Sequence, residues 1–261
     1  MSSNNDTIQK TIIVSLLLCV ICSVLVSTAA VMLKPLQLAN IEQDMKSNIL
    51  SAAGLSDPNR TVNELFEQIT VRIIDLETGL YTDEVNADTY DFRKAARDPA
   101  LSENLGRRDD IASIKRKPRF MPVYLQHDAD GNIEKLILPV YAYGLWSTMY
   151  GFLALEGDLN TVAGIGFYEH AETPGLGGEI DNPSWQATWP GKKVYPGDEA
   201  EQPALGVIKG SVDTGSPRAQ HQIDGLAGAT LTSNGVSNMI KFWLGDAGYA
   251  RFIANLHAGE V

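Results

Sequence analysis

The feature that most limits how this chain folds is an uninterrupted apolar run near its amino terminus. Residues 11–33 are 23 consecutive side chains without a charge, and Lys10 and Lys34 close the run. At about 1.5 Å of rise per residue, such a helix extends about 34 Å and crosses a hydrocarbon core of about 30 Å. A cleaved signal peptide is the alternative, but its apolar core usually covers only about 7 to 15 residues. The run therefore predicts one transmembrane helix over residues 11–33, embedded in a lipid bilayer.

Charge and cysteine content exclude several functions for the rest of the chain. The net charge is −11, from 21 basic and 32 acidic side chains, so no nucleic-acid partner is expected. Cys19 and Cys22 both lie inside the apolar run, which leaves no cysteine for a disulfide or a thiolate metal site elsewhere. The Asp128–Asn132 turn superficially resembles a calcium loop, but Pro139 stands where the bidentate glutamate belongs. No metal site is predicted.

The chain after the apolar run is predicted to form a helical stalk and linker over residues 34–60. Apolar residues recur near helical spacing until Gly54 and Pro58, which stop the helix: Leu36, Ile41, Met45, Ile49 and Leu50. Thr61 and Glu64 then form a capping-box pattern that predicts a second, short helix.

A cluster of basic side chains lies in the polar segment 83–119. Its members are Arg107, Arg108, Lys115, Arg116, Lys117 and Arg119. Lipid headgroups are one interpretation. Residues 35–261 carry 19 basic and 31 acidic side chains, so solvated surface or a docking face for an acidic partner is the favoured interpretation. Residues 61–119 are assigned to the N-terminal part of the soluble domain.

Short apolar and β-prone runs predict a sheet of several strands. Two of them, at 120–125 and 133–140, flank Asp130-Gly131 and are expected to pair as a hairpin. The other runs lie at 71–75, 150–155, 163–168 and 204–212. Helices precede and follow these strands without regular alternation, so the predicted class is α+β, with a mixed, mainly antiparallel sheet flanked by helices.

The most informative turn runs from Asp224 to Thr230 and leads into a helix. Gly225 and Gly228 let the backbone bend and approach a ligand closely, and Ala229 adds little bulk. The first turn of such a helix presents free N–H groups and the positive end of the helix dipole, which suit a phosphate. From these residues alone, a plain helix cap remains the favoured interpretation.

A second unusual stretch, residues 169–179, is rich in glycine. Its exposed backbone, with Glu172, Thr173, Leu176 and Gly177, is suited to contact a planar polar ring, whereas the simpler interpretation is a Pro-Gly turn. Two further candidates come from outside this stretch. Trp146 is expected at a strand end and Lys209 on the late strand, although a core tryptophan and a solvated lysine are the default interpretations.

These segments together resemble the FMN-binding domain family. Residues 224–230 resemble the flavinylation signature Asp-x-x-(Ser/Thr)-Gly-Ala-Thr of that family, and residues 172–177, Glu-Thr-Pro-Gly-Leu-Gly, resemble its companion loop. The sequence Gly-Leu-Trp-Ser at 144–147 precedes both in the expected order. Ala227 departs from the signature, which prefers a hydroxyl at that position. The resemblance assigns residues 120–261 to the FMN-binding domain.

The resemblance implies a covalently bound FMN. The Thr230 hydroxyl would be esterified by the FMN phosphate, which a separate flavin transferase transfers from FAD, and Thr232 is a competing hydroxyl. The surroundings of the flavin would include Trp146, Thr173 and Leu176, with Glu172, Gly177, Lys209, Gly228 and Ala229 as further binding residues. Asp224 would either serve the modification or shape the turn. No catalytic residue beyond the flavin itself is expected.

The resemblance also implies a role and a location. The chain would relay electrons between redox centres of partner subunits in a sodium-pumping NADH:quinone oxidoreductase of the bacterial inner membrane. The resemblance places residues 1–10 in the cytoplasm and the soluble domain in the periplasm. The charges that flank the apolar run do not decide this orientation by themselves. The alternatives are the flavin subunit of an ion-translocating ferredoxin:NAD oxidoreductase and a membrane-tethered binding or assembly module without a cofactor.

Overall fold

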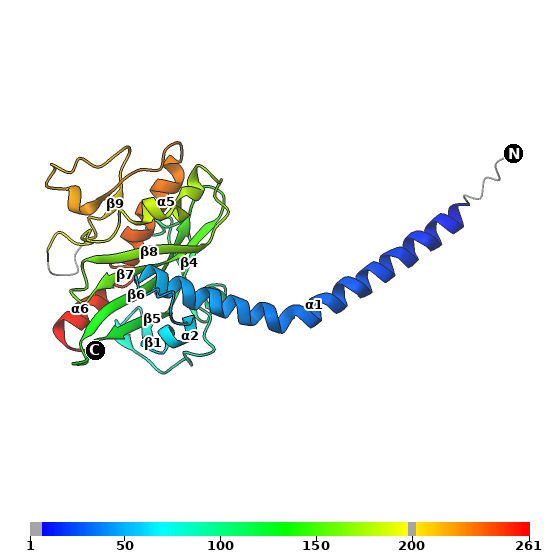
Figure 1. The fold of residues 1–261 in the computed structure, drawn as a ribbon, viewed down its shortest axis with the longest axis horizontal. Coiled ribbons are helices and arrows are strands. Elements are labelled where there is room, and N and C mark those ends of the chain that lie inside the picture. Colours follow the sequence, from blue (N-terminus) through cyan, green and yellow to red (C-terminus); the bar gives the residue numbers. More distant parts are fainter. Residues whose placement is uncertain (1–6, 198–201) are drawn as a thin grey trace. The chain divides into compact units, whose positions relative to one another are not determined.

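The computed structural model describes residues 7–197 and 202–261 (Figure 1). Residues 1–6 of the predicted tail lie outside the described residues. The chain divides into two units, residues 1–45 and 46–261. The first unit, where it is described, is almost entirely the helix α1, which spans Ile8–Ala52 and continues into the second unit.

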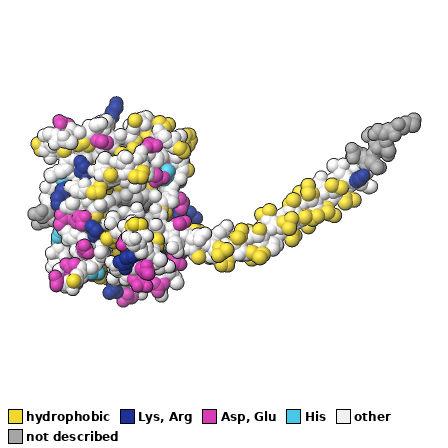
Figure 2. Space-filling model, viewed as in Figure 1, with side chains coloured by type: hydrophobic (Ala, Val, Ile, Leu, Met, Phe, Trp, Pro, Cys, Tyr) yellow, Lys and Arg dark blue, Asp and Glu magenta, His cyan; other side chains and the backbone are white. Residues whose placement is uncertain are grey.

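Helix α1 contains the predicted apolar run and the predicted stalk in one continuous element. Its 45 residues correspond to about 68 Å of helix. It includes Pro35 and ends two residues before Gly54, whose φ of +70° ends the helical path. This helix is the one in the described part of the chain that is long and apolar enough to cross a membrane. Figure 2 shows hydrophobic side chains along its length.

The centre of residues 46–261 is a six-stranded sheet in the order β2-β1-β5-β6-β7-β8. All its neighbouring strands pair antiparallel, and consecutive hairpins connect β5 to β8. The strands are β1 (Ile69–Asp75), β2 (Leu80–Tyr81), β5 (Phe120–His127), β6 (Ile133–Tyr143), β7 (Thr148–Glu156) and β8 (Val162–Glu169). The predicted α+β class and the predicted 120–140 hairpin are therefore confirmed.

Each face of this sheet carries its own apolar cluster, because side chains alternate between the faces along a strand. On one face, Ile137 and Phe152 pack with Ile49 and Leu50 from the last turns of α1. The larger cluster, on the opposite face, is covered by α5 (Thr230–Trp243) and α6 (Ala250–Ala258). Both faces are thus buried, and the strands read as nearly continuous apolar runs.

Short elements complete the fold. The predicted capping box is present, with Thr61 and Glu64 bonded to each other's backbone N–H at the start of α2 (Val62–Phe66). The segment up to β5 contains α3 (Phe92–Ala95), β3 (Ser102–Asn104) and β4 (Arg116–Pro118). After β8 come η1 (Gly177–Asp181), α4 (Pro183–Gln186), β9 (Gly206–Val207), η2 (Ala219–His221) and β10 (Gln222–Ile223).

The strand predicted over residues 204–212 is wrong in extent. Only Gly206–Val207 is a strand, paired in parallel with β10, and Lys209 lies beyond it. Gly210 has a φ of +82° and its carbonyl accepts from the Gly225 N–H at 2.8 Å, and this contact holds the chain away from an extended path.

The open edge of β6 is capped by aromatic side chains. Pairing between β5 and β6 stops at Ile137, so the carbonyl groups farther along β6 on that side have no strand partner. Trp243 Nε1 donates to the Tyr141 carbonyl at 2.7 Å, and the Tyr249 hydroxyl donates to the Pro139 carbonyl at 2.7 Å. These bonds fix the end of α5 and the start of α6 against the strand that leads into the site described below.

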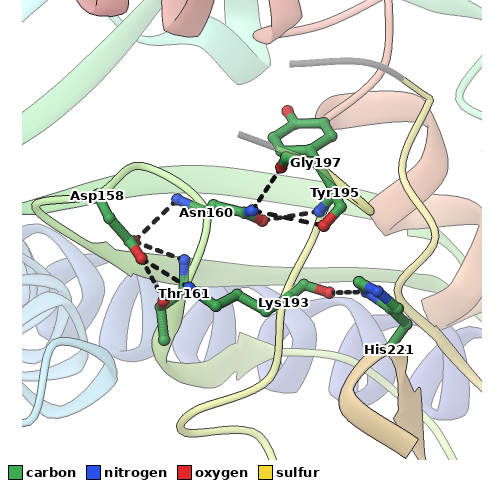
Figure 3. Close-up of polar contacts among 7 residues, drawn as sticks. All are labelled: Asp158, Asn160, Thr161, Lys193, Tyr195, Gly197 and His221. Atoms are coloured by element: carbon green, nitrogen blue, oxygen red, sulfur yellow. Dashed lines mark hydrogen bonds and ion pairs between the residues drawn. The ribbon is translucent and has the colours of Figure 1, made fainter. Parts of the chain in front are cut away.

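A polar cluster connects the β7–β8 turn to the segment around residue 195 (Figure 3). Asp158 accepts from Lys193 Nζ at 2.8 Å, and Asn160 bonds to both the N–H and the carbonyl of Tyr195. His221 Nδ1 lies 2.7 Å from the Lys193 carbonyl, which links η2 to the same segment. These hydrogen bonds therefore hold the middle of the long connection between β8 and α5 against the β7–β8 turn.

Candidate flavin site

Three segments meet at the start of α5. They are the β6–β7 turn at residues 144–147, the loop at 170–176 after β8, and the turn at 224–229. The β6–β7 turn approaches the loop at 170–176 closely at Gly144. A side chain there would collide with Glu172, because its Cβ would lie 2.6 Å from Glu172 Oε1. Gly228 has a φ of +71°, and a Cβ there would lie 3.0 Å from Leu176 Cδ2. The three sequence motifs are therefore brought together in space.

Thr230 is the first residue of α5, and the helix begins without a side-chain cap. The preceding residue, Ala229, supplies no side-chain hydrogen bond to the first turn. Free N–H groups and the positive end of the dipole therefore face outward from a helix of 14 residues. The Thr230 side chain is exposed at the same place.

The other hydroxyls at the start of α5 are occupied. Thr232 is 0% exposed and donates to Glu172 Oε2 at 2.5 Å. Ser233 is buried and accepts from the Leu226 N–H at 3.2 Å. Of the three hydroxyl side chains, Thr230 is thus the exposed one.

Glu172 joins the three segments. Its Oε1 accepts from the N–H groups of Leu145 at 3.0 Å and Trp146 at 2.9 Å, while Oε2 accepts from Thr232. Burial on its own raises the pKa of Glu172. The hydrogen bonds from Thr232 and from the backbone of Trp146 and Leu145 outweigh burial and leave the pKa of Glu172 below its usual value. The carboxylate is therefore charged at neutral pH and holds the turn against the helix.

Apolar side chains are exposed around Thr230. Trp146 is 63% exposed, Leu176 43% and Leu231 58%. The Trp146 indole is nevertheless oriented, because Nε1 donates to Thr173 Oγ1 at 3.1 Å. Trp146 is therefore not a core residue, and these side chains offer an apolar surface to a planar ring.

Asp224 and Lys209 lie in the backbone framework behind the turn. The Asp224 carboxylate accepts from the Val212 N–H at 2.7 Å, and its carbonyl accepts from Trp185 Nε1 at 2.8 Å. Two roles were considered for Asp224, serving the modification and shaping the turn. These two hydrogen bonds are contacts that shape the turn. Lys209 is exposed, and the neighbouring Gly210 carbonyl accepts from the Gly225 N–H at 2.8 Å.

Several residues of the site are not predicted as site residues by the sequence. Thr232 stands there only as a competing hydroxyl, and Ser147 only as part of a motif. Ser147 Oγ accepts from the Ala171 N–H at 2.8 Å, and His170 Nδ1 accepts from the Glu172 N–H at 3.1 Å. Ser147 could have been found from the Gly-Leu-Trp-Ser motif that contains it. The bond between Glu172 and Thr232 joins residues 60 positions apart, and no sequence motif indicates it.

The residues present fit a phosphorylated flavin. An uncapped helix N-terminus suits a phosphate, an exposed threonine hydroxyl stands at that terminus, and exposed Trp146 and Leu176 suit an aromatic ring. Gly177 lies where a Cβ would collide with Thr232 and Glu172, so the loop is packed closely behind this surface.

Comparison with known proteins identifies the family. Residues 144–245 match the model of the FMN-binding domain, a range that contains all three segments of the site. A Pseudomonas aeruginosa protein, named as the C subunit of Na(+)-translocating NADH-quinone reductase, is 53% identical over 99% of this chain and 100% of its own length. The protein of that name from Vibrio alginolyticus is 49% identical over the full length of both chains. The chain belongs to this C-subunit family.

Solved structures of the family have the same fold. The crystal structure of NqrC from Shewanella oneidensis is 33% identical, with a TM-score of 0.74 over 84% of this chain and 99% of that one. The crystal structure of the Na(+)-translocating NADH-quinone reductase C subunit from Parabacteroides distasonis is 26% identical, with a TM-score of 0.63 over 85% of this chain and 96% of that one. Membership of the C-subunit family favours the NADH:quinone interpretation over the ferredoxin:NAD alternative, since the matched relatives carry the former name.

Proposed function

We propose that this chain is a membrane-anchored electron-carrier subunit of a Na(+)-translocating NADH-quinone reductase, with FMN attached through a phosphoester to Thr230. The observation that carries the proposal is the exposed Thr230 hydroxyl at the uncapped start of α5. Membership of the C-subunit family and the match to the FMN-binding domain support it. Other subunits of the complex and a flavin transferase are the proposed partners.

The residues of the site have separate tasks in this proposal. The free N–H groups of the first turn of α5 bind the phosphate oxygens, and the Thr230 oxygen holds the phosphorus. Trp146, Leu176 and Leu231 cover the ring, while Thr173 fixes the indole and Glu172 fixes the turn that carries it. The small residues of the site leave room for FMN to approach the backbone; they are Gly177, Gly228 and Ala229. Lys209 contributes positive charge near the turn at residues 224–229.

When bound, FMN supplies a redox group that accepts and donates single electrons as well as pairs. The chain's own residues bind and orient it, and the ester prevents its loss. Residues 11–33 anchor the chain in the inner membrane. Residues 1–10 are proposed to be cytoplasmic and residues 46–261 periplasmic.

The test is the mass of the peptide that contains Thr230. We expect wild-type protein, produced with a flavin transferase, to yield this peptide with one added FMN moiety, whereas Thr230→Ala yields the unmodified peptide. Thr230→Ser keeps a hydroxyl and should regain the modification. Thr214→Ala removes a hydroxyl from an exposed loop outside the site and should leave the modification unchanged.

Folding must be separated from modification in this experiment. Thr230→Ala removes no side-chain cap, so its stability should change by less than about 1 kcal/mol. In-gel flavin fluorescence retained by Thr230→Ala would contradict the assignment of the acceptor. Wild-type protein without flavin in the presence of the transferase would instead favour a binding module without a cofactor.

A further inference from the structure

His170 lies between the loop at residues 170–176 and the helix η1, and both of its ring nitrogens are bonded. Nε2 lies 2.6 Å from Asp181 Oδ2 on η1, and Nδ1 lies 3.1 Å from the backbone nitrogen of Glu172. The His170 side chain is 13% exposed, so the imidazole is largely removed from water. The ring therefore connects the loop that contains Glu172 to the short helix that follows it.

The two contacts decide which ring nitrogen carries the hydrogen. A backbone N–H can only donate, so Nδ1 of His170 is the unprotonated nitrogen and accepts from Glu172. A neutral imidazole then carries its hydrogen on Nε2, and this hydrogen points to the Asp181 carboxylate. Only this neutral tautomer satisfies both bonds.

Protonation of His170 removes one of the two bonds. An imidazolium carries a hydrogen on each nitrogen, so Nδ1 can no longer accept, and its hydrogen faces the N–H hydrogen of Glu172. The contact of Nε2 with Asp181 survives and becomes an ion pair, which keeps the ring in place. The group that loses its partner is therefore the backbone N–H of Glu172, a residue that is 4% exposed.

The charges around His170 favour its protonation. The charged side chains on the neighbouring elements are Asp181 and Glu179 of η1, Glu169 at the end of β8, Arg93 close to α3, and Glu172 of the same loop. Arg93 is paired with Glu169 by two hydrogen bonds, and Glu179 accepts from Asn182 at 2.7 Å. The β6–β7 turn meets this segment with the neutral Ser147 hydroxyl. Asp181 is thus the direct charge partner of the imidazolium.

The position of the Glu172 backbone matters because the carboxylate of the same residue joins the segments of the site. That carboxylate accepts from the N–H groups of Leu145 and Trp146 in the β6–β7 turn, and from the Thr232 hydroxyl on α5. One residue therefore holds the bond to His170 at its backbone and the bonds to the turn and to α5 at its side chain. A loop that moves away from the imidazolium loosens those bonds as well.

His221 has the opposite arrangement. Its Nδ1 lies 2.7 Å from the Lys193 carbonyl, which can only accept, so this nitrogen is a donor. Its Nε2 lies 3.1 Å from the exposed Gln220 amide nitrogen. Protonation of His221 thus keeps the bond to the backbone and removes only a contact between exposed side chains. At His170, by contrast, the nitrogen that gains a proton is the partner of a backbone group on a buried residue.

We propose that His170 is a pH-dependent positioning residue, whose neutral form holds the Glu172 loop in the geometry of the site and whose protonation releases that loop. Imidazoles titrate between about pH 5 and 8, which sets the range in which to look for the release. The inference rests on the proposed function only for its consequence, which is that acidification alters the surroundings of the flavin. The tautomer and the release of the loop belong to the chain itself and can be measured without flavin.

The first measurement is the tautomer of His170 in the wild-type full chain, in a neutral detergent. Magnetic resonance of histidine labelled at its ring nitrogens distinguishes the tautomers, and the signals of His170 are those lost in His170→Asn. We expect a hydrogen on Nε2 alone at about pH 8 and on both nitrogens at about pH 5. A hydrogen on Nδ1 at about pH 8 would overturn the proposal. This measurement is made on wild type, so it does not depend on the stability of a variant.

The second measurement is amide hydrogen exchange of the peptide that contains Glu172. At about pH 5, this peptide should exchange about tenfold faster in wild type than in His170→Asn, whereas at about pH 8 the two should agree. Asparagine places Oδ1 as many bonds from the backbone as Nδ1, so this variant keeps an acceptor and does not titrate. His170→Ala has no acceptor and should exchange rapidly at both pH values. His257→Asn, on an exposed histidine of α6, is the matched control and should behave like wild type.

Two further readouts follow the release through the site. The peptide that contains Leu145 and Trp146 should lose protection together with the Glu172 peptide, because Glu172 accepts from both N–H groups. Asp181→Asn removes the charge that stabilises the imidazolium, so the loop should be released only at a lower pH.

The outcomes separate this inference from the proposed function. Equal exchange of the Glu172 peptide in wild type and His170→Asn at about pH 5 would overturn the inference, with or without flavin attached. A wild-type chain that shows the expected tautomer and release but never acquires flavin would overturn the proposed function and leave the role of His170 standing.

Discussion

Two threonines, Thr230 and Thr232, are chemically alike and separated by one residue, yet their surroundings differ completely. Thr230 stands exposed at the first position of α5, while the Thr232 hydroxyl is buried and bonded to a carboxylate. A modifying enzyme needs an accessible nucleophile, so burial alone distinguishes the two. For the proposed attachment of FMN, the choice of Thr230 over Thr232 thus has a basis in the substrate chain itself.

Glu172→Gln should destabilise the protein, because the bonds of Glu172 to Leu145, Trp146 and Thr232 are assisted by its charge. We expect a loss of about 1 to 2 kcal/mol at pH 7 in the free energy of unfolding, measured with urea. Glu134→Gln, on an exposed glutamate of β6, is the control and should change stability little.

The effect of Glu172→Gln should depend on pH in a defined direction. The pKa of Glu172 is lowered in the folded state, so the carboxylate stabilises the protein above its unfolded pKa of about 4.3. That contribution decreases as the pH falls through the folded pKa. The difference between wild type and variant should therefore shrink at acidic pH, and a difference that stays constant down to pH 2 would argue against a charged role.

The contacts of the site show what the sequence could and could not predict at this scale. The residue types of the Glu172 loop and of the 224–230 turn indicated a place where backbone approaches a ligand. They did not indicate that Glu172 bonds to Thr232 or that Trp146 is exposed, because both follow from long-range packing. Spacing in the sequence contains no information on which hydroxyl faces a carboxylate 60 residues away.

Among the structural elements, the turn before α5 depends on the conformation of Gly228. Gly228→Ala places a Cβ at a φ of +71° and 3.0 Å from Leu176 Cδ2. We expect a loss of more than about 1 kcal/mol in thermal unfolding and a slower attachment of FMN, because the backbone at Gly228 becomes strained and the Leu176 side chain must move aside.

Gly131→Ala is the matched control for this variant. Gly131 has a φ of +86°, but a Cβ there meets nothing within 4 Å. It should lose about 1 kcal/mol from backbone strain alone and keep normal flavin attachment. Equal losses of stability and equal attachment in the two variants would show that the contact with Leu176 is unimportant.

The strands differ in how well the sequence predicts them. Residues 120–140 contain two apolar runs separated by an Asp-Gly turn. These local features are sufficient to predict the hairpin of β5 and β6. Residues 204–212 have similar composition, but Gly210 adopts a left-handed conformation in the structure. Glycine permits that conformation without requiring it, so only the packing against Gly225 decides where β9 ends.

For the molecule as a whole, the end of α1 belongs to the core of the soluble unit. A chain that starts at Lys46 keeps Ile49 and Leu50, which are 0% and 2% exposed in the structure. It should therefore fold and leave the membrane fraction after cell lysis. A chain that starts at Asp57 loses both side chains, at a cost of about 3 to 6 kcal/mol.

The measurement is the free energy of unfolding of both truncated chains, together with their distribution between membrane and soluble fractions. Restoring only Ala52 and Ala53 to the shorter chain should recover little, since they bury small side chains. Equal stability of the two truncated chains would mean that α1 contributes no packing to the domain.

The capped edge of β6 limits how other proteins recognise this molecule. A partner that docks by strand addition needs a row of free backbone carbonyl and amide groups. At Pro139 and Tyr141 the carbonyl groups are already bonded to Tyr249 and Trp243. Both positions are therefore closed to strand addition, and two copies of this chain cannot pair there through their backbones.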